Sequence, residues 1–251
     1  MLLTAPLFGG KHLIGLLLIT ILFMVFGSVL SKSKSLNHRK MILIFMIMFY
    51  VLEIVKIGYI IYLDKVYPIY QLPLHLCSVP LYLYPLMYFF KDSKLVENYI
   101  KPAAYSLVLI AGIMALALPT NIIGGDTNWF PLIDNILPII SFFYHGLMIF
   151  SSIYLIKSKY YKFEMSNYIK VMSVGVFFAI MAIIANALLD KDFMLLNYAT
   201  GSPLVFILEI SKPLYILSMI GGFAILIGII FIITDIVLNK NFARKKLNNN
   251  K

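Results

Sequence analysis

Apolar residues run along the chain in seven long stretches that short polar segments separate. A helix needs about 20 apolar residues to cross a bilayer core about 30 Å thick, and each stretch reaches or nearly reaches that length. The third is the shortest and carries Pro73, Pro80 and Pro85, which predicts a bent helix whose freed carbonyls are satisfied by its neighbours. The predicted membrane-spanning helices are 12–31, 41–63, 73–90, 100–123, 134–156, 168–189 and 213–237.

Basic residues alternate between rich and poor connections. Sixteen Lys and Arg residues lie in the segments 31–40, 91–101 and 157–170 and in the C-terminal tail, whereas the other connections hold only four. Cytoplasmic loops carry the excess of Lys and Arg, so we predict an extracellular N-terminus and a cytoplasmic C-terminus. The expected fold class is all-α, a polytopic membrane helix bundle with seven transmembrane helices. Residues 1–239 form its single domain, and residues 240–251 form a basic, disordered cytoplasmic tail.

Composition narrows the class of protein further. Hydrophobic residues make up 61% of the chain and charged residues 13%, against about 45–50% and about 25% in soluble domains. The net charge of +10 is explained by membrane orientation, so we expect membrane lipids and no nucleic acid as partners. The only cysteine, Cys77, excludes an intrachain disulfide and a multi-cysteine metal cage. Phosphate-loop, di-acidic metal and serine-elbow motifs are missing, so no cofactor and no metal is expected.

Polar residues gather in the outer half of the predicted bundle. Glu53 and Lys56 are three apart and share a helical face; a charge pair inside a membrane marks either a functional site or a mutually neutralising structural pair. With a rise of about 1.5 Å per residue, residues of five segments share this half, and we expect a polar cavity below the outer surface. These residues are Glu53, Lys56, Gln71, His75, Cys77, His145, Asn186, Asn197 and Tyr198.

The segment 71–77 holds the candidate chemistry. Pro73 suits the first position of a helix, which would place Cys77 near a helix N-terminus that favours thiolate. His75 is two residues from Cys77 and would point to the opposite face, unless the helix starts later, so His145 is the better candidate base. A cysteine with a histidine in hydrogen-bond reach is the minimum for thiol catalysis. Alternatives remain: an inert buried cysteine, an interhelical histidine, or a zinc site whose spacing is not diagnostic.

These motifs resemble those of a known family. Gln71-Leu-Pro-Leu-His-Leu-Cys77, followed by Phe143-Tyr144-His145 and by a block at 193–198, is similar to the YwaF-type bacterial integral membrane proteins, where that block more often begins with Asn-Tyr than with Asp192-Phe193. That family is similar to animal transmembrane acyltransferases that move polyunsaturated acyl chains onto ether phospholipids. The resemblance implies that Cys77 accepts the acyl chain and that His145 or His75 is the essential histidine. The androgen-induced lipid-ester hydrolases, which use a threonine and a histidine, are more distantly similar.

Three hypotheses follow. The leading one is a lipid-directed thiol acyltransferase or hydrolase in the cell membrane. In it, Cys77 attacks an acyl ester, His145 (or His75) moves the proton, and the other polar residues bind substrate or order the site; these are Glu53, Lys56, Gln71, Asn186, Asn197 and Tyr198. Kinked helices and intramembrane polar groups are equally expected in a transporter or a small-molecule-binding membrane protein. In the third hypothesis the chain is a non-catalytic assembly protein, and the polar cluster holds helices together.

Overall fold

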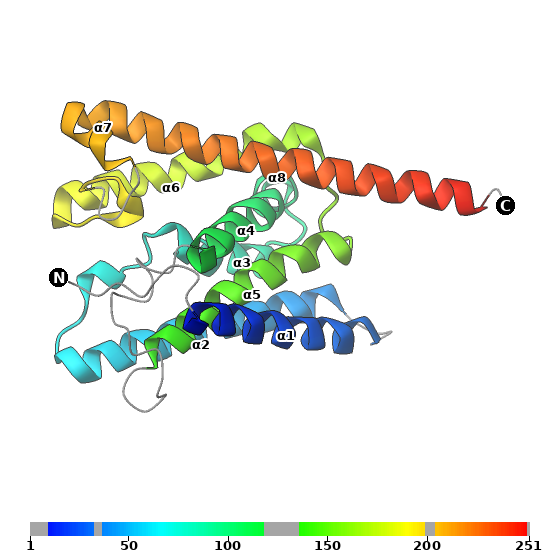
Figure 1. Cartoon of the computed structure of the whole chain (residues 1–251), viewed down its shortest axis with the longest axis horizontal. Helices are drawn as coiled ribbons and strands as arrows, with labels where there is room; N and C mark the ends of the chain where they lie inside the picture. The colour runs from blue at the N-terminus through cyan, green and yellow to red at the C-terminus, as the bar shows by residue number, and fades with distance from the viewer. Residues whose placement is uncertain (1–9, 33–36, 118–135, 199–203, 250–251) are drawn as a thin grey trace.

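The protein is a bundle of α-helices (Figure 1). The structure is a computed structural model, and it describes residues 10–32, 37–117, 136–198 and 204–249. Within these ranges the chain forms helices and no strand, which confirms the all-α class. The main helices are α1 (Gly10–Lys32), α2 (His38–Asp64), α3 (Pro80–Phe89), α4 (Lys101–Ala117), α5 (Leu137–Lys157), α6 (Tyr168–Leu189), α7 (Val205–Ile210) and α8 (Lys212–Asn249). Short helical turns lie between them: η1 (Ile69–Gln71), η2 (Leu76–Ser78), η3 (Val96–Ile100), η5 (Met165–Asn167) and η6 (Phe193–Leu195).

In the described part of the chain, five helices are long and apolar enough to cross a membrane. They are His38–Asp64, Val96–Ala117, Leu137–Lys157, Met165–Leu189 and Lys212–Asn239. Two further apolar helices, His12–Ser28 and Leu76–Phe89, are shorter. Each of the seven predicted stretches overlaps one of these helices, and the predicted positions 118–123 and 134–135 lie outside the described residues.

The helices alternate in direction. In Figure 1, α1 and α8 run toward the same end of the bundle, while α2 and α6 run the opposite way. The turns at the helix ends have local causes. The Asn37 side chain accepts from the Arg39 N–H at 2.9 Å and caps α2, because the first amides of a helix have no partner within it. Lys65, in the left-handed conformation, closes the other end of α2.

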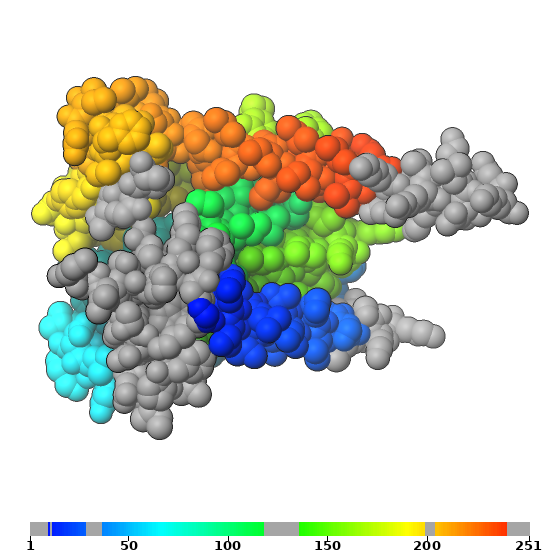
Figure 2. All heavy atoms as spheres, viewed as in Figure 1, coloured from blue at the N-terminus to red at the C-terminus, as the bar shows by residue number. Residues whose placement is uncertain are grey.

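The core forms around α4. This helix packs against α3, α5, α6 and α8, and most of its length is buried. At Gly112 a Cβ atom would lie 2.9 Å from the carbonyl oxygen of His145, so only glycine allows this close approach of α4 to α5. The outer helix α8 exposes apolar side chains between Leu214 and Leu238, and Figure 2 shows it lying across one side of the molecule.

Two predicted boundaries need correction. The third helix does not begin at Pro73: α3 begins at Pro80, which takes the first helical position in its place. The segment predicted as a disordered tail continues α8 as far as Asn249. The connection 190–212, between the last two predicted helices, contains η6 and α7 in its described part. Both elements are shorter than two helical turns and too short to show a hydrophobic period.

Candidate functional site

The charged pair on α2 is the first component of the site. The Lys56 Nζ lies 2.8 Å from Oε1 of Glu53, as the three-residue spacing predicts. The Glu53 side chain is buried, whereas that of Lys56 is partly exposed. Glu53 Oε1 makes this ion-pair contact but no hydrogen bond with any described residue. A buried carboxylate is tolerated when an opposite charge compensates it, and Lys56 supplies that charge here.

The segment 71–77 is largely non-helical. Gln71 ends η1 and donates its backbone N–H to the Pro68 carbonyl at 2.8 Å. His75 donates from Nε2 to the Tyr70 carbonyl at 3.0 Å, and its ring packs edge-on against Phe193, with 5.2 Å between centroids. The expectation that His75 and Cys77 stand on one regular helix is therefore wrong. Residues 71–77 instead contact the block 193–198, which is far away in sequence.

Cys77 lies in η2, three residues before α3 begins, and is partly buried. The Tyr144 hydroxyl on α5 donates to the Cys77 carbonyl oxygen at 3.1 Å. Tyr144 is itself buried, and its ring packs against Phe49 of α2 at a centroid distance of 5.2 Å. The turn that carries Cys77 is thus held directly by the helix that carries His145.

His145 is buried in α5 with one ring nitrogen engaged. Its Nδ1 lies 2.7 Å from the Ser141 carbonyl oxygen and 3.3 Å from the Ser141 hydroxyl. Because a carbonyl only accepts hydrogen bonds, we assign the ring proton to Nδ1. Nε2 then carries the lone pair; it is buried and has no hydrogen-bond partner among the described residues. An imidazole oriented through one nitrogen and unpartnered at the other has the arrangement of a general base.

Packing through Tyr144 brings these groups together. Its hydroxyl bonds to the Cys77 carbonyl, and its ring contacts Phe49, which lies one helical turn before Glu53 on α2. The ion pair of α2, the turn of Cys77 and the inner side of α5 therefore share one region of the bundle. Within the described part of the chain no hydrogen bond joins the Cys77 thiol to either histidine, so the expected contact is not formed in this state of the protein.

The predicted polar residues near the end of α6 and just after it hold a loop together. Asn186 is buried, accepts from the Phe193 N–H at 2.6 Å and donates to the Phe193 carbonyl at 3.0 Å. Asn197 donates to the Lys191 carbonyl at 2.9 Å and accepts from Lys212 of α8. The Tyr198 hydroxyl donates to Asp190, and this hydrogen bond raises the pKa of Tyr198.

Backbone strain explains why this loop needs so many bonds. Asp190, Met194 and Leu195 all have positive φ, and each such residue costs on the order of 1–3 kcal/mol. Besides Asn186, the Tyr215 hydroxyl holds the loop by donating to the Leu195 carbonyl at 2.6 Å. Asn186, Asn197 and Tyr198 thus order the loop that packs on His75, rather than contacting Cys77 or His145.

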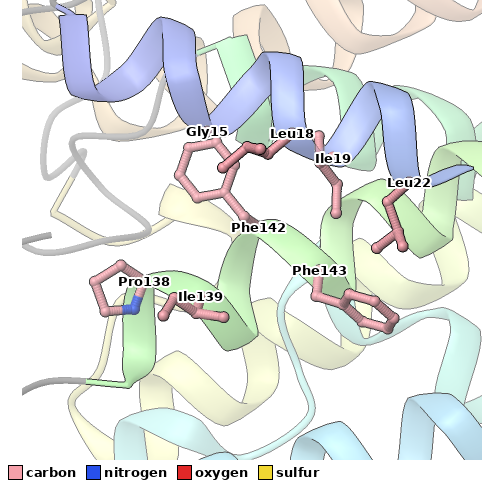
Figure 3. Close-up of a pocket in the computed structure, with 8 residues that line it drawn as sticks. All are labelled: Gly15, Leu18, Ile19, Leu22, Pro138, Ile139, Phe142 and Phe143. Carbon is pink, nitrogen blue, oxygen red and sulfur yellow. The ribbon is translucent and has the colours of Figure 1, made fainter. Parts of the chain in front are cut away.

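Two hollows lie away from this site. Figure 3 shows an apolar groove between α1 and α5, lined by Gly15, Leu18, Ile19, Leu22, Pro138, Ile139, Phe142 and Phe143. The other, between the start of α2 and the end of α3, is lined by Arg39 and residues 88–93. Neither is lined by Cys77 or His145, so neither is the polar cavity that the sequence predicts. The described residues also contain no group of three or more His, Cys, Asp or Glu side chains that could hold a metal.

Sequence reasoning missed two contributors, Tyr144 and the carbonyl of Ser141. Tyr144 stands beside His145 in the motif Phe143-Tyr144-His145, which was the available signal. Its hydrogen bond spans 67 positions of sequence, and no local pattern predicts such a contact.

Comparison with known families gives one match. A sequence model of the TMEM164 family matches residues 7–235. The chain belongs to the TMEM164 family. No curated protein and no solved structure matches it. Membership of the TMEM164 family, together with several apolar helices long enough to span a bilayer, makes this chain a multi-pass integral membrane protein.

Proposed function

We propose that this protein is a membrane enzyme that transfers or hydrolyses acyl chains of membrane lipids, with Cys77 as nucleophile and His145 as proton carrier. One observation carries the proposal. The Nε2 of His145 is buried and has no hydrogen-bond partner among the described residues, and Tyr144, the residue before it in the chain, donates a hydrogen bond from its hydroxyl to the Cys77 carbonyl. A thiol needs a base to become a nucleophile. His145 is better suited than His75, because His75 packs against the block 193–198.

The proposed chemistry balances with two reactants, the lipid ester that donates the acyl chain and an alcohol or water that accepts it. The Cys77 sulfur bonds to the carbonyl carbon of an acyl ester while His145 Nε2 takes the thiol proton. The ester C–O bond breaks, and His145 returns the proton to the departing alcohol. A second alcohol, or water, then attacks the thioester carbonyl and loses its proton to His145. The C–S bond breaks, and His145 returns this proton to the Cys77 sulfur, which restores the free thiol and the neutral imidazole. Catalytic hydrogen bonds are often long before substrate binds, so the Cys77–His145 bond would form with a lipid in place.

In this scheme, Lys56, held by Glu53, stabilises the negative charge that develops during the reaction. A cation in a low-dielectric site stabilises an oxyanion far better than it does in water. The ion pair with Glu53 fixes the position of Lys56 on α2, in the region of the bundle that also holds the Cys77 turn. In the proposal, Lys56 therefore favours negative charge at the reacting centre, and Gln71 and the block 193–198 border the site.

The proposal includes a seven-span topology with an extracellular N-terminus in the cell membrane. The shorter helices His12–Ser28 and Leu76–Phe89 are taken as the two additional spans. The opposite directions of α1 and α2, and the common direction of α1 and α8, support an odd number of crossings (Figure 1). The excess of basic residues in alternate connections favours the cytoplasm for the C-terminal end of α8.

This topology makes a labelling prediction. In a Cys77→Ala background, Lys65→Cys at the end of α2 should react in intact cells with a maleimide that cannot cross membranes. Ser158→Cys, at the end of α5, should react only after the cells are permeabilised. Lys65 is exposed, and a denatured sample of each variant controls for thiol reactivity. The reverse pattern, or labelling of both positions in intact cells, would contradict the topology.

The function is tested by searching for the acyl-enzyme. Purified protein is incubated with phosphatidylcholine vesicles whose acyl chains carry a terminal alkyne, and the label is read on the protein by mass spectrometry. We expect a label on Cys77 that neutral hydroxylamine removes, because it is a thioester. Cys77→Ala should carry none, and the neighbouring Ser78→Ala should label as the unmodified chain does. Vesicle lipids remodelled equally well by Cys77→Ala would refute the mechanism.

A further inference from the structure

The Cys77 carbonyl lacks the partner that a continuing helix would supply. In η2 the Ser78 N–H donates to the His75 carbonyl at 2.9 Å, and the Val79 N–H to the Leu76 carbonyl at 3.2 Å. The next bond of this series would come from residue 80 to Cys77, but residue 80 is a proline and has no N–H. No backbone N–H of the described residues donates to this oxygen outside the helices. Pro80 therefore leaves the carbonyl open, and the Tyr144 hydroxyl occupies it.

Tyr144 is well fixed for this task. Its side chain is buried, and its ring contacts Phe49 of α2 and the ring of His145, with centroid distances of 5.2 Å and 5.6 Å. Tyrosine has only two rotatable side-chain bonds, so a packed ring whose hydroxyl is hydrogen-bonded has little freedom to move. It connects α5 to the turn of Cys77 and braces both against α2.

We propose that Tyr144 is a positioning residue, which sets the distance between the Cys77 thiol and the His145 imidazole. Tyr144 and His145 are consecutive on one rigid helix, so any shift of the Cys77 turn relative to Tyr144 is a shift relative to His145. Misplacement of reacting groups by about 1 Å can cost up to about 100-fold in rate. Tyr144 bonds to the main chain of Cys77 and not to its sulfur, so its role is indirect. The inference rests on the proposed function of Cys77 and His145.

A double-mutant cycle tests this role, using the rate at which alkyne-tagged phosphatidylcholine acylates Cys77. Tyr144→Phe removes only the hydroxyl, and we expect acylation to slow about tenfold, the upper range for one neutral hydrogen bond. In a His145→Ala background the same change should slow acylation less than about twofold, because there is no longer a base to align with. Equal effects in both backgrounds, or no effect in either, would overturn the inference.

A matched control separates positioning from loss of a hydrogen bond in general. Tyr168 of α6 donates to the Ala224 carbonyl of α8 at 3.1 Å, the same type of bond at another helix pair. Tyr168→Phe should leave acylation unchanged in both backgrounds. Two outcomes would refute the proposed function and not the role of Tyr144. In one, the unmodified chain forms no acyl-Cys77; in the other, His145→Ala is acylated as fast as the unmodified chain.

Pro80→Ala tests whether Tyr144 positions the Cys77 turn or only supplies a hydrogen bond to the Cys77 carbonyl. It also provides a test if Tyr144→Phe alone is unstable. An N–H at residue 80 can donate to the Cys77 carbonyl and continue η2. Added to Tyr144→Phe, this change should restore the thermal midpoint but not the acylation rate, because the link to α5 is still missing. Recovery of both quantities would show that Tyr144 serves only to satisfy the oxygen, and it would overturn the inference.

Discussion

Replacing His145 with alanine is expected to slow acylation of Cys77 by about 10²–10⁴-fold, the usual contribution of a positioned general base. The folded bundle should remain, because among the described residues the His145 side chain bonds only to Ser141 on the same helix. The rate with alkyne-tagged phosphatidylcholine measures the first effect, and the thermal midpoint in detergent measures the second. The residual rate should rise about tenfold per pH unit, since the thiol must then lose its proton to solvent.

Two other histidines serve as comparisons. His38 bonds to the Tyr154 hydroxyl at 3.1 Å near the start of α2, and His38→Ala should not change acylation. His75→Ala should have a modest effect, because His75 contacts Tyr70 and Phe193 rather than a group on α5. If His75→Ala abolished acylation while His145→Ala acylated normally, His75 would be the base and the assignment of roles here would be wrong.

The fold could largely be predicted from the hydrophobic pattern, because lipid imposes a minimum length on every apolar helix. The start of α3 could not. Pro73 and Pro80 both suit a first helical position, and sequence alone does not choose between them. In the structure the Tyr82 hydroxyl donates to the Pro73 carbonyl at 2.8 Å, and His75 donates to the Tyr70 carbonyl. These contacts satisfy the backbone of a non-helical segment, which a local pattern cannot anticipate.

The sequence predicts a set of candidate site residues but not how they are arranged in space. Spacing on one helix was sufficient for the pair Glu53 and Lys56. The contact between Tyr144 and Cys77 depends on how α5 packs beside η2, so it could not be read from either segment. Likewise, Asn186 and Asn197 were expected in the site because they are polar near a membrane. The structure uses them for the backbone of a strained loop. The resemblance to the YwaF-type proteins and the acyltransferases stays a prediction.

The ion pair of α2 supports the second large prediction. Lys56→Met should lower the free energy of unfolding by about 3–5 kcal/mol, because it leaves the buried Glu53 without compensation. At about 2–4 °C per kcal/mol for a chain of this size, the thermal midpoint in detergent should fall on the order of ten degrees. Lys162→Met should change little, because Lys162 is largely exposed and lies 3.8 Å from Glu164.

The double variant Glu53→Gln/Lys56→Met decides what the pair is for. Replacing both charges removes the uncompensated carboxylate, so most of the lost stability should return, as in other proteins where buried ion pairs were replaced by neutral groups. Because the proposal assigns Lys56 the stabilisation of negative charge at the reacting centre, we expect this stable variant to acylate Cys77 at least about tenfold more slowly. If it acylates at the normal rate, the pair is structural and the reacting groups work without it. If the double variant is as unstable as Lys56→Met, charge compensation does not explain the loss. The contact between the two side chains is then what stabilises α2.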